Sequence, residues 1–185
     1  MAFPAFLDTN VLYGATLCDT MLRLAEQGAY RPHWSKDVLG ELVAVLVREA
    51  GISRQRADLR IAEMQRAFPL AAVEDYDALV DAMTCDQKDR HVLAAAVQSR
   101  CEVVVTFNVK DFPPESTEPH QISAVTPDAF LLDQLDLHPP MVERALLGQV
   151  TQAKRPPLTM GQLLGSLARA GAPAFAEEAR RHEFH

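Results

Sequence analysis

Acidic side chains recur at places where a folded chain could gather them around a metal ion. Asp8 follows the apolar run "AFL", which we expect to form a buried strand that ends there. In open α/β sheets, ligand sites lie just beyond the carboxyl ends of the strands. Glu41 comes three residues after Val38 and four before Val45 on a predicted helix, so it points along the apolar face toward the sheet. A carboxylate there is costly unless it is paired or bound to metal, and the alternative is a helix-edge Glu that reaches solvent.

The stretch "DQKDRHVLAAA" places two aspartates three residues apart, in front of an alanine-rich apolar run. If Asp86 is the N-cap of a helix, Asp89 takes the third helical position, which is capping-box spacing. Asp89 also precedes Val92 and Leu93 by three and four residues, so it extends the buried stripe by one turn. Helical phase therefore favours Asp89 as a metal ligand and Asp86 as the N-cap, with a direct or water-mediated metal contact as the alternative for Asp86.

A fourth group of oxygen ligands follows the β-branched run in "VVVTFNVKDFP". Asn108 and Asp111 lie just past the predicted strand, where Asn and Asp are also common turn formers. Carboxylate and amide oxygens, without a competing Cys/His cluster, suit Mg²⁺ or Mn²⁺. A site of this kind activates water and stabilises charge on a phosphoryl centre. Thr9 and Asn10, directly after Asp8, could support the metal or its waters.

The elements that must position these residues alternate between strand and helix. Strands are predicted near residues 5–8, 29–34, 70–75, 103–106 and 121–126, the second of them weakened by Pro32. Helices are predicted between them, capped by Ser35, Ser53 and Asp86. This alternation predicts an α/β fold with a mainly parallel central sheet. After Pro127 the sequence predicts helices only, so we expect an α/β domain over residues 1–127 and a helical C-terminal extension over residues 128–185.

Composition restricts the class of protein. The formal net charge is −7, which is mild evidence against a large phosphate-binding surface, although carboxylates clustered for metal would also make a nuclease acidic. The three cysteines form no CxxC pair, which favours a reducing cytoplasm over a disulfide framework. No stretch approaches the roughly 20 apolar residues that span a bilayer, so we expect no membrane association.

Four motifs in order, "FLDTNVL", "SKDVLGELVAVL", "DQKDRHVLAAAV" and "VVVTFNVKDF", resemble the PIN-domain ribonucleases, and within them the VapC-type toxins of bacterial toxin–antitoxin pairs. The resemblance covers roughly residues 3–130 and implies a three-layer α/β sandwich. It implies a metal-dependent endoribonuclease that leaves 5′-phosphate and 3′-hydroxyl ends, with Asp8, Glu41 and Asp89 as catalytic carboxylates. Asn108 departs from the pattern, because many members carry an aspartate there. The fourth ligand is thus Asn108 through its amide oxygen, Asp111 directly, or either residue through water.

Partners are also implied by the resemblance: an RNA substrate, an antitoxin protein that inserts a segment near the active site, and a second copy of the chain in a homodimer. Arg90, His91 and Lys110 lie beside the candidate ligands and could contact phosphates. The competing interpretation is that these first-turn and loop residues simply face water.

Two other functions fit parts of the sequence. A non-cleaving RNA-binding or protein-interaction module on the same fold is compatible with Asn108 and with the acidic balance. A phosphatase with an aspartyl nucleophile after the first strand would normally need a second Asp two residues on. Asn10 occupies that position, which counts against a phosphatase.

Overall fold

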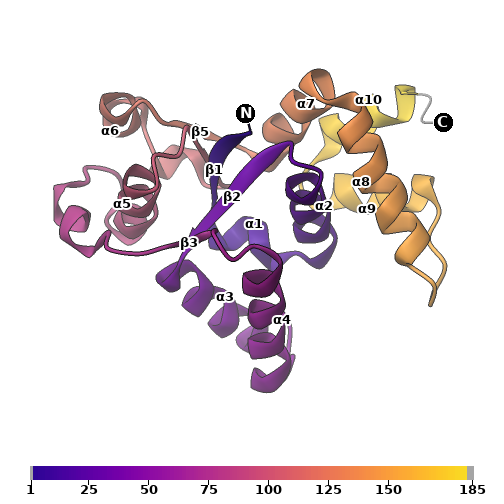
Figure 1. Ribbon diagram of the computed structural model, residues 1–185, viewed down its shortest axis with the longest axis horizontal. Helices are drawn as coiled ribbons and strands as arrows, with labels where there is room; N and C mark the ends of the chain where they lie inside the picture. Colours follow the sequence, from indigo (N-terminus) through magenta and orange to yellow (C-terminus); the bar gives the residue numbers. More distant parts are fainter. Residues whose placement is uncertain (1, 183–185) are drawn as a thin grey trace.

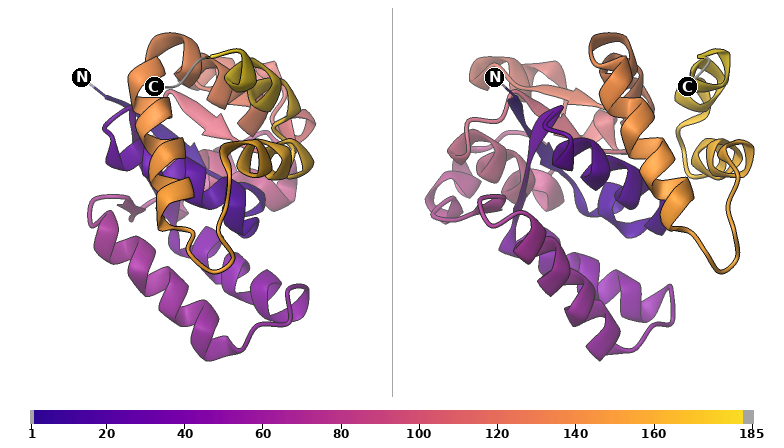
Figure 2. Two further views of the ribbon diagram at one scale, coloured as in Figure 1. Left: turned by 90° about the vertical axis from the view of Figure 1, so that its right-hand side faces the viewer. Right: turned by 45° about the vertical axis from the view of Figure 1, so that its right-hand side comes forward.

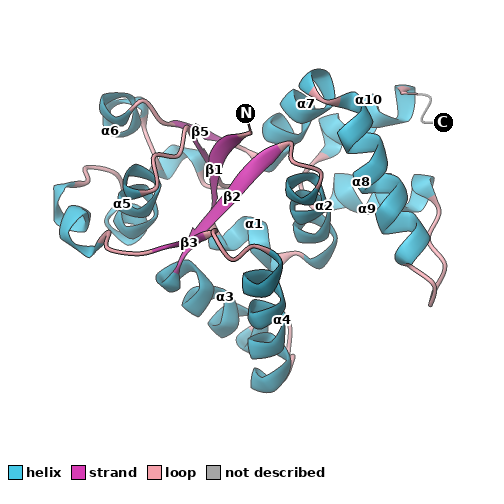
Figure 3. Cartoon of the chain, in the orientation of Figure 1, coloured by secondary structure: helices cyan, strands magenta, loops and turns pink. Residues whose placement is uncertain are grey.

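The computed structural model describes residues 2–182 and has a five-stranded, wholly parallel sheet at its centre. The strands are β1 (Phe3–Leu7), β2 (Tyr30–Ser35), β3 (Ala72–Val73), β4 (Val103–Val105) and β5 (Ser123–Val125). Their order in the sheet is β3-β2-β1-β4-β5, so β1 is the middle strand. Figure 3 shows the strands (magenta) surrounded by helices (cyan). The predicted parallel α/β fold is confirmed, and β2 forms despite Pro32, which pairs with Ala5.

Helices cover both faces of the sheet. In Figure 1, α2 (Ala15–Glu26) and α5 (Arg90–Gln98) lie on opposite sides of the strands. The helices α3 (Lys36–Arg48) and α4 (Arg54–Ala67) form an arm that projects away from the sheet. Short 3-10 turns complete the connections at η1 (Asp77–Ala82), η2 (Gln87–Asp89), η3 (Val109–Asp111) and η4 (Glu118–His120). The α-helices of this part are α1 (Thr9–Tyr13), α2 (Ala15–Glu26), α3 (Lys36–Arg48), α4 (Arg54–Ala67), α5 (Arg90–Gln98) and α6 (Pro114–Thr117). This is the three-layer arrangement that the resemblance implied.

One predicted helix begins later than its sequence suggested. The chain from Asp86 first makes the separate turn η2, closed by a backbone bond from Asp89 N to Asp86 O of 2.9 Å, and α5 starts only at Arg90. Asp86 is the cap, as predicted, because its side chain accepts from the Lys88 N–H at 3.0 Å. The prediction that Asp89 sits in the first turn of the long helix was wrong, since the tight turn places it just before that helix.

The C-terminal region is helical, as predicted, and packs on the rest of the chain. Its helices are α7 (Pro127–Leu137), α8 (Pro139–Gln152), α9 (Met160–Arg169) and α10 (Pro173–Arg181). Their buried apolar side chains belong to the same continuous core as those of the sheet. Figure 2 shows these helices (orange to yellow) grouped together and separate from the α3–α4 arm (purple), which projects at the bottom of both views. The capping box of Thr159 and Gln162 is confirmed. No helix within residues 2–182 is both long and apolar enough to cross a bilayer.

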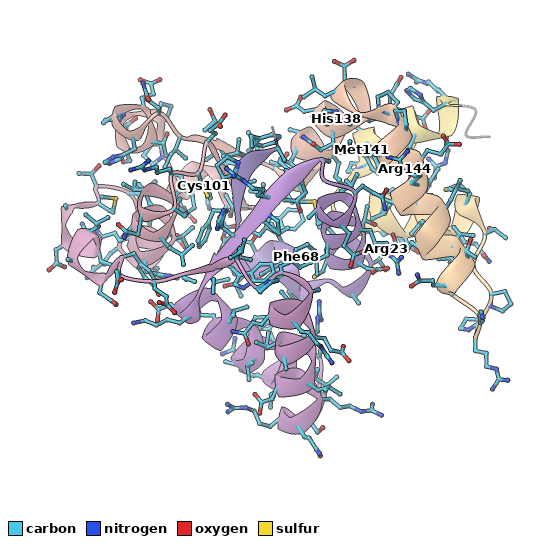
Figure 4. The ribbon with its side chains drawn as sticks, viewed as in Figure 1. Arg23, Phe68, Cys101, His138, Met141 and Arg144 are labelled. Atoms are coloured by element: carbon cyan, nitrogen blue, oxygen red, sulfur yellow. The ribbon has the colours of Figure 1, made fainter. Side chains whose placement is uncertain are left out.

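Polar contacts between α2 and α8 fix the C-terminal helices to the sheet domain. Arg23 donates to Gln152 at 2.8 Å and Arg144 donates to Gln27 at 2.8 Å, and Figure 4 labels both arginines where these helices meet. Beneath them, the buried Thr20 hydroxyl donates to Gln149 Oε1 at 2.7 Å.

Thr20→Val is expected to lower the free energy of unfolding by about 1–3 kcal/mol, because Gln149 Oε1 would remain buried without its donor. Urea denaturation would measure the change. Thr16→Val is the matched control, since the structure uses only the main-chain carbonyl of Thr16 in this contact. Equal losses for the two variants would show that replacing a hydroxyl by a methyl group in α2, and not the lost hydrogen bond to Gln149, causes the effect.

Candidate active site

Asp8 is the most constrained of the predicted site residues. It ends β1, is only 4% exposed and caps α1. Its Oδ1 accepts from the Thr9 N–H at 2.7 Å, and its Oδ2 accepts from the Asn10 amide at 2.8 Å and from the Thr106 hydroxyl at 2.7 Å. A carboxylate buried with donors on both oxygens is held in one orientation.

Thr106 links the carboxyl ends of the two central strands, and it was not predicted as a site residue. Its hydroxyl donates to Asp8, accepts from the Asn10 amide at 3.1 Å and accepts from the Asn108 N–H at 3.1 Å. The same hydroxyl therefore fixes the carboxylate on one strand and the loop after the other. The sequence signal was present, since Thr106 is the polar end of the clearest β-branched run.

Thr106→Val is expected to weaken divalent-metal affinity about 10–100-fold, because it removes a group that orients a ligand. The free energy of unfolding should fall by about 2 kcal/mol, since Asp8 and Asn108 lose a buried partner. Calorimetric titration with Mn²⁺ and urea denaturation measure the two effects, with Thr106→Ser as the control that keeps the hydroxyl. Unchanged Mn²⁺ affinity in Thr106→Val would refute the orienting role.

Glu41 is brought to Asp8 by packing of α3 against α1. Its Oε2 accepts from the Thr9 hydroxyl at 2.7 Å, and its Oε1 lies 3.1 Å from His91 Nε2 on α5. The side chain is 48% exposed, so it occupies the edge of the apolar face and does not lie fully under the helix. The hydrogen bond from His91 lowers the pKa of Glu41, against an opposing effect of burial. His91 thus contacts a carboxylate, where the sequence suggested a phosphate.

A pocket of about 320 Å³ gathers most of the predicted site residues at the carboxyl ends of β1 and β4. Tyr13 and Glu49, which were not predicted, also line it. The predicted residues that line it are Asp8, Thr9, Asn10, Glu41, Asp89 and Asn108. Four carboxylates, from three segments far apart in the sequence, therefore line one cavity: Asp8, Glu41, Glu49 and Asp89.

The remaining predicted residues lie outside this lining. Asp86 and Asp111 are joined through their main chains, with Asp86 N donating to Asp111 O at 3.1 Å. Both are close enough to Asp89 for their charges to act on it. Lys110 is exposed, and the Nε of Arg90 is buried without a hydrogen-bond partner within residues 2–182. A phosphate contact by Arg90 or Lys110 stays a prediction.

Comparison with known proteins places this site in a family. Residues 4–110 match the PIN domain, which is more than half of the chain. The chain belongs to the PIN-domain family. Residues 127–181 match a second family, the VapC50 C-terminal domain. A protein of Mycobacterium tuberculosis named "Putative ribonuclease VapC50" is 49% identical over 106 residues, which cover 57% of this chain and 62% of that relative.

The PIN-domain pocket concentrates negative charge. Burial raises the pKa of Asp8, partly offset by its hydrogen bonds from Thr106 and Thr9, and the charge of Glu41 raises it further. Burial also raises the pKa of Asp89 to about 6, with added contributions from the charges of Asp8, Asp111 and Asp86. Neighbouring carboxylates thus make Asp8 and Asp89 harder to ionise, whereas the pKa of Glu41 is lowered by His91.

The donor set of this pocket fits a divalent cation. Within residues 2–182 the only ion pair that reaches Asp8, Glu41 or Asp89 is that of His91 with Glu41, and no Lys or Arg neutralises the group. In the same part of the chain, no three His, Cys, Asp or Glu side chains stand close enough to form a complete metal cluster. Oxygen ligands whose ionisation is opposed by mutual repulsion would be relieved by a hard cation such as Mg²⁺ or Mn²⁺.

Proposed function

We propose that this chain is a metal-dependent endoribonuclease, the toxin of a type II toxin–antitoxin pair. The observation that carries the proposal is the pocket in which Asp8, Glu41 and Asp89 converge without a basic side chain to neutralise all three. The name of the M. tuberculosis relative, which describes a ribonuclease, supports it. PIN-domain ribonucleases generally depend on a divalent metal, and the oxygen-only donor set favours Mg²⁺ or Mn²⁺.

The residues proposed to hold the ion are Asp8, Glu41 and Asp89, with Asn108 or Asp111 as the fourth ligand. Asp86 is proposed mainly as a cap, with a direct or water-mediated contact to the ion as the alternative. When bound, such an ion lowers the pKa of water and neutralises charge on a phosphoryl group. Asp8 is pre-oriented by Thr106, Asn10 and the Thr9 N–H, so Asp8 itself needs little reorganisation on binding. Within residues 2–182 no three His, Cys, Asp or Glu side chains already form a cluster, so Glu41 and Asp89 would move toward Asp8 to share one ion.

Other parts of the chain also have proposed roles in the same reaction. Thr9 and His91 hold the two oxygens of Glu41 and prevent its half-exposed side chain from swinging into solvent. Asn10 and Thr106 hold the loop that carries Asn108 through hydrogen bonds to its main chain. Arg90 and Lys110 are proposed to contact the RNA backbone.

Further proposals concern the whole protein. We propose a nuclease domain over residues 1–127 and a C-terminal extension over residues 128–185. The proposed partners are an antitoxin and a second copy of the chain. We propose the cytoplasm as the site of action, consistent with three free cysteines that are all buried.

A cleavage assay tests this function. A pool of structured RNAs labelled at the 5′ end is incubated with the chain while Mg²⁺ is titrated, and the product ends are analysed. We expect cleavage that requires the metal and leaves 5′-phosphate ends. Tight RNA binding without cleavage at any Mg²⁺ or Mn²⁺ concentration would instead favour a non-cleaving binding module.

A further inference from the structure

A partly exposed aromatic side chain, Phe107, follows Thr106 in the loop past β4, next in sequence to the pocket-lining Asn108 and outside the lining itself. Phe107 lies between Thr106, which holds Asp8, and Asn108, which lines the pocket. Its side chain is 38% exposed, although most large apolar side chains of the chain are buried. Its N–H donates to Asn10 Oδ1 at 3.1 Å, and Asn10 in turn donates to Asp8. The backbone under the ring is therefore fixed relative to the site by the same network that orients the carboxylate.

The C-terminal extension reaches this ring. Gly171, in the turn between α9 and α10, packs so closely that a Cβ at that position would lie 2.4 Å from Cε1 and 2.9 Å from Cζ of Phe107. Its φ of +101° is also a conformation that other residues rarely adopt. Glycine is thus required twice here, for the turn and for the close approach, and the extension forms a wall against one side of Phe107.

We propose that Phe107 is a stacking platform for an unpaired nucleobase next to the scissile phosphate, and that Gly171 of the C-terminal extension sets the position of its ring. The inference rests on the proposed ribonuclease function and adds a base-binding subsite to it. Single-stranded RNA is commonly held by bases that stack on aromatic side chains, and each such contact contributes about 1–3 kcal/mol.

Because the chain is acidic, a contact that does not depend on charge can contribute much of its affinity for RNA. With a formal net charge of −7 and at least three carboxylates at the site, long-range attraction for phosphates is weak. Stacking does not depend on counterion release, so it can hold RNA where a basic surface is lacking. Because Asn10 already fixes the backbone of Phe107, little conformational entropy is lost when a base stacks on the ring.

The test compares Phe107→Leu, which keeps apolar bulk but loses the aromatic face, with Phe107→Tyr, which keeps both. Both are made in an Asp8→Asn background, so that the RNA survives during titration. Fluorescence anisotropy measures binding of a short single-stranded oligoribonucleotide and of an abasic ribose-phosphate chain of the same length. We expect Phe107→Leu to weaken binding of the oligoribonucleotide about 10-fold and binding of the abasic chain hardly at all, with Phe107→Tyr close to the parent.

The role of the extension is tested with Gly171→Ala and a matched control, Gly28→Ala. Gly28 has a φ of +82°, but a Cβ there meets nothing within 4 Å, so this variant carries the backbone strain without the contact to Phe107. Gly171→Ala should weaken oligoribonucleotide binding about as much as Phe107→Leu does. In the double variant, Gly171→Ala should weaken binding little beyond the effect of Phe107→Leu alone. Gly28→Ala should change the melting temperature and leave RNA binding unchanged. If Gly171→Ala fails to fold, the Phe107 variants still decide the proposal.

Two results would overturn the inference in distinguishable ways. If the unmodified chain cleaves RNA but Phe107→Leu binds the oligoribonucleotide as tightly as the parent, the stacking proposal is refuted and the proposed ribonuclease function stands. Phe107 would then be a contact for a protein partner. If the unmodified chain neither cleaves nor binds RNA, the proposed function fails, and the stacking platform fails with it.

Discussion

Replacing Asp8 with asparagine is expected to abolish metal-dependent RNA cleavage, with a rate loss on the order of 10³-fold. Asp8 is the buried carboxylate that anchors the site, and its three hydrogen bonds leave it no freedom to move away from a bound ion. The amide has the same shape and lacks the charge that burial and Glu41 disfavour, which favours the fold. Its NH2 group must however face donors that now serve the carboxylate, so we expect a folded variant of lower stability. Rates of cleavage at saturating Mg²⁺ measure the loss, and circular dichroism verifies the fold.

The control for Asp8→Asn is Asp58→Asn. Asp58 lies on α4 and pairs with Arg54 in an exposed contact of 2.9 Å, outside the carboxylate pocket. We expect its cleavage rate to match that of the unmodified chain, because an exposed pair contributes little. Undiminished cleavage by folded Asp8→Asn would show that RNA is cut elsewhere, or that a contaminating nuclease does so.

Replacing Asp89 with asparagine is expected to inactivate the chain and at the same time to stabilise it. Burial and the charges of Asp8, Asp111 and Asp86 raise the pKa of Asp89 to about 6, so its ionised form is unfavourable in the folded chain. Asn removes that charge. Because the side chain is only half-buried, solvent screening limits the expected gain in the free energy of unfolding to about 1 kcal/mol at pH 7. Urea denaturation measures the gain, and the cleavage assay measures the lost activity.

The raised pKa of Asp89 also predicts the direction in which the free energy of unfolding changes with pH. Between pH 4 and about 6 the folded chain binds a proton at Asp89 that the unfolded chain has already lost, so the contribution of Asp89 to stability falls as pH rises through this window. In Asp89→Asn this decline should be shallower, with the two stability curves converging below pH 4. A difference in the free energy of unfolding between Asp89→Asn and the unmodified chain that stays constant from pH 4 to pH 7 would contradict the assignment of the charge penalty to Asp89.

Asp86→Ala is the matched comparison for Asp89→Asn. Asp86 caps η2 through the Lys88 N–H, so its loss should cost about 1 kcal/mol of stability and leave much of the activity. The two aspartates, three residues apart, are thus expected to change stability in opposite directions. An inactive but equally stable Asp86→Ala would make Asp86 the ligand in place of Asp89.

The elements that could be predicted from the sequence are those determined by interactions between residues close together in the chain. The β-branched run around Val104 and the serine caps of α3 and α4 act over a few residues, and the corresponding elements formed. The start of α5 was misplaced, because the choice between a 3-10 turn and an α-turn after Asp86 depends on the main-chain contact with Asp111, a tertiary feature. The weak strand at Ala72–Val73 is only two residues long and forms because β2 is beside it.

The acidic residues of the site could be predicted from their positions at strand ends and on helix faces, but the partners that hold them could not. His91 was considered as a phosphate contact, and its bond to Glu41 depends on how α3 and α5 pack. The only local signal of Thr106 is its place as the polar end of a strand, and Gly171 has none, because their roles arise from contacts with Asp8 and Phe107, far away in the sequence. The hydrogen-bond partners of the acidic residues could therefore be identified only from tertiary contacts, and not from the spacing of residues in the sequence.

Diffraction from crystals soaked in Mn²⁺, recorded at the manganese absorption edge, would show whether Asp8, Glu41 and Asp89 form one divalent-cation site at the carboxyl ends of β1 and β4. We expect an anomalous peak in this pocket, about 2.0–2.3 Å from carboxylate oxygens of these residues, that disappears in Asp8→Asn. Well-diffracting crystals at saturating Mn²⁺ that show no peak there, or whose peak survives in Asp8→Asn, would contradict this expectation.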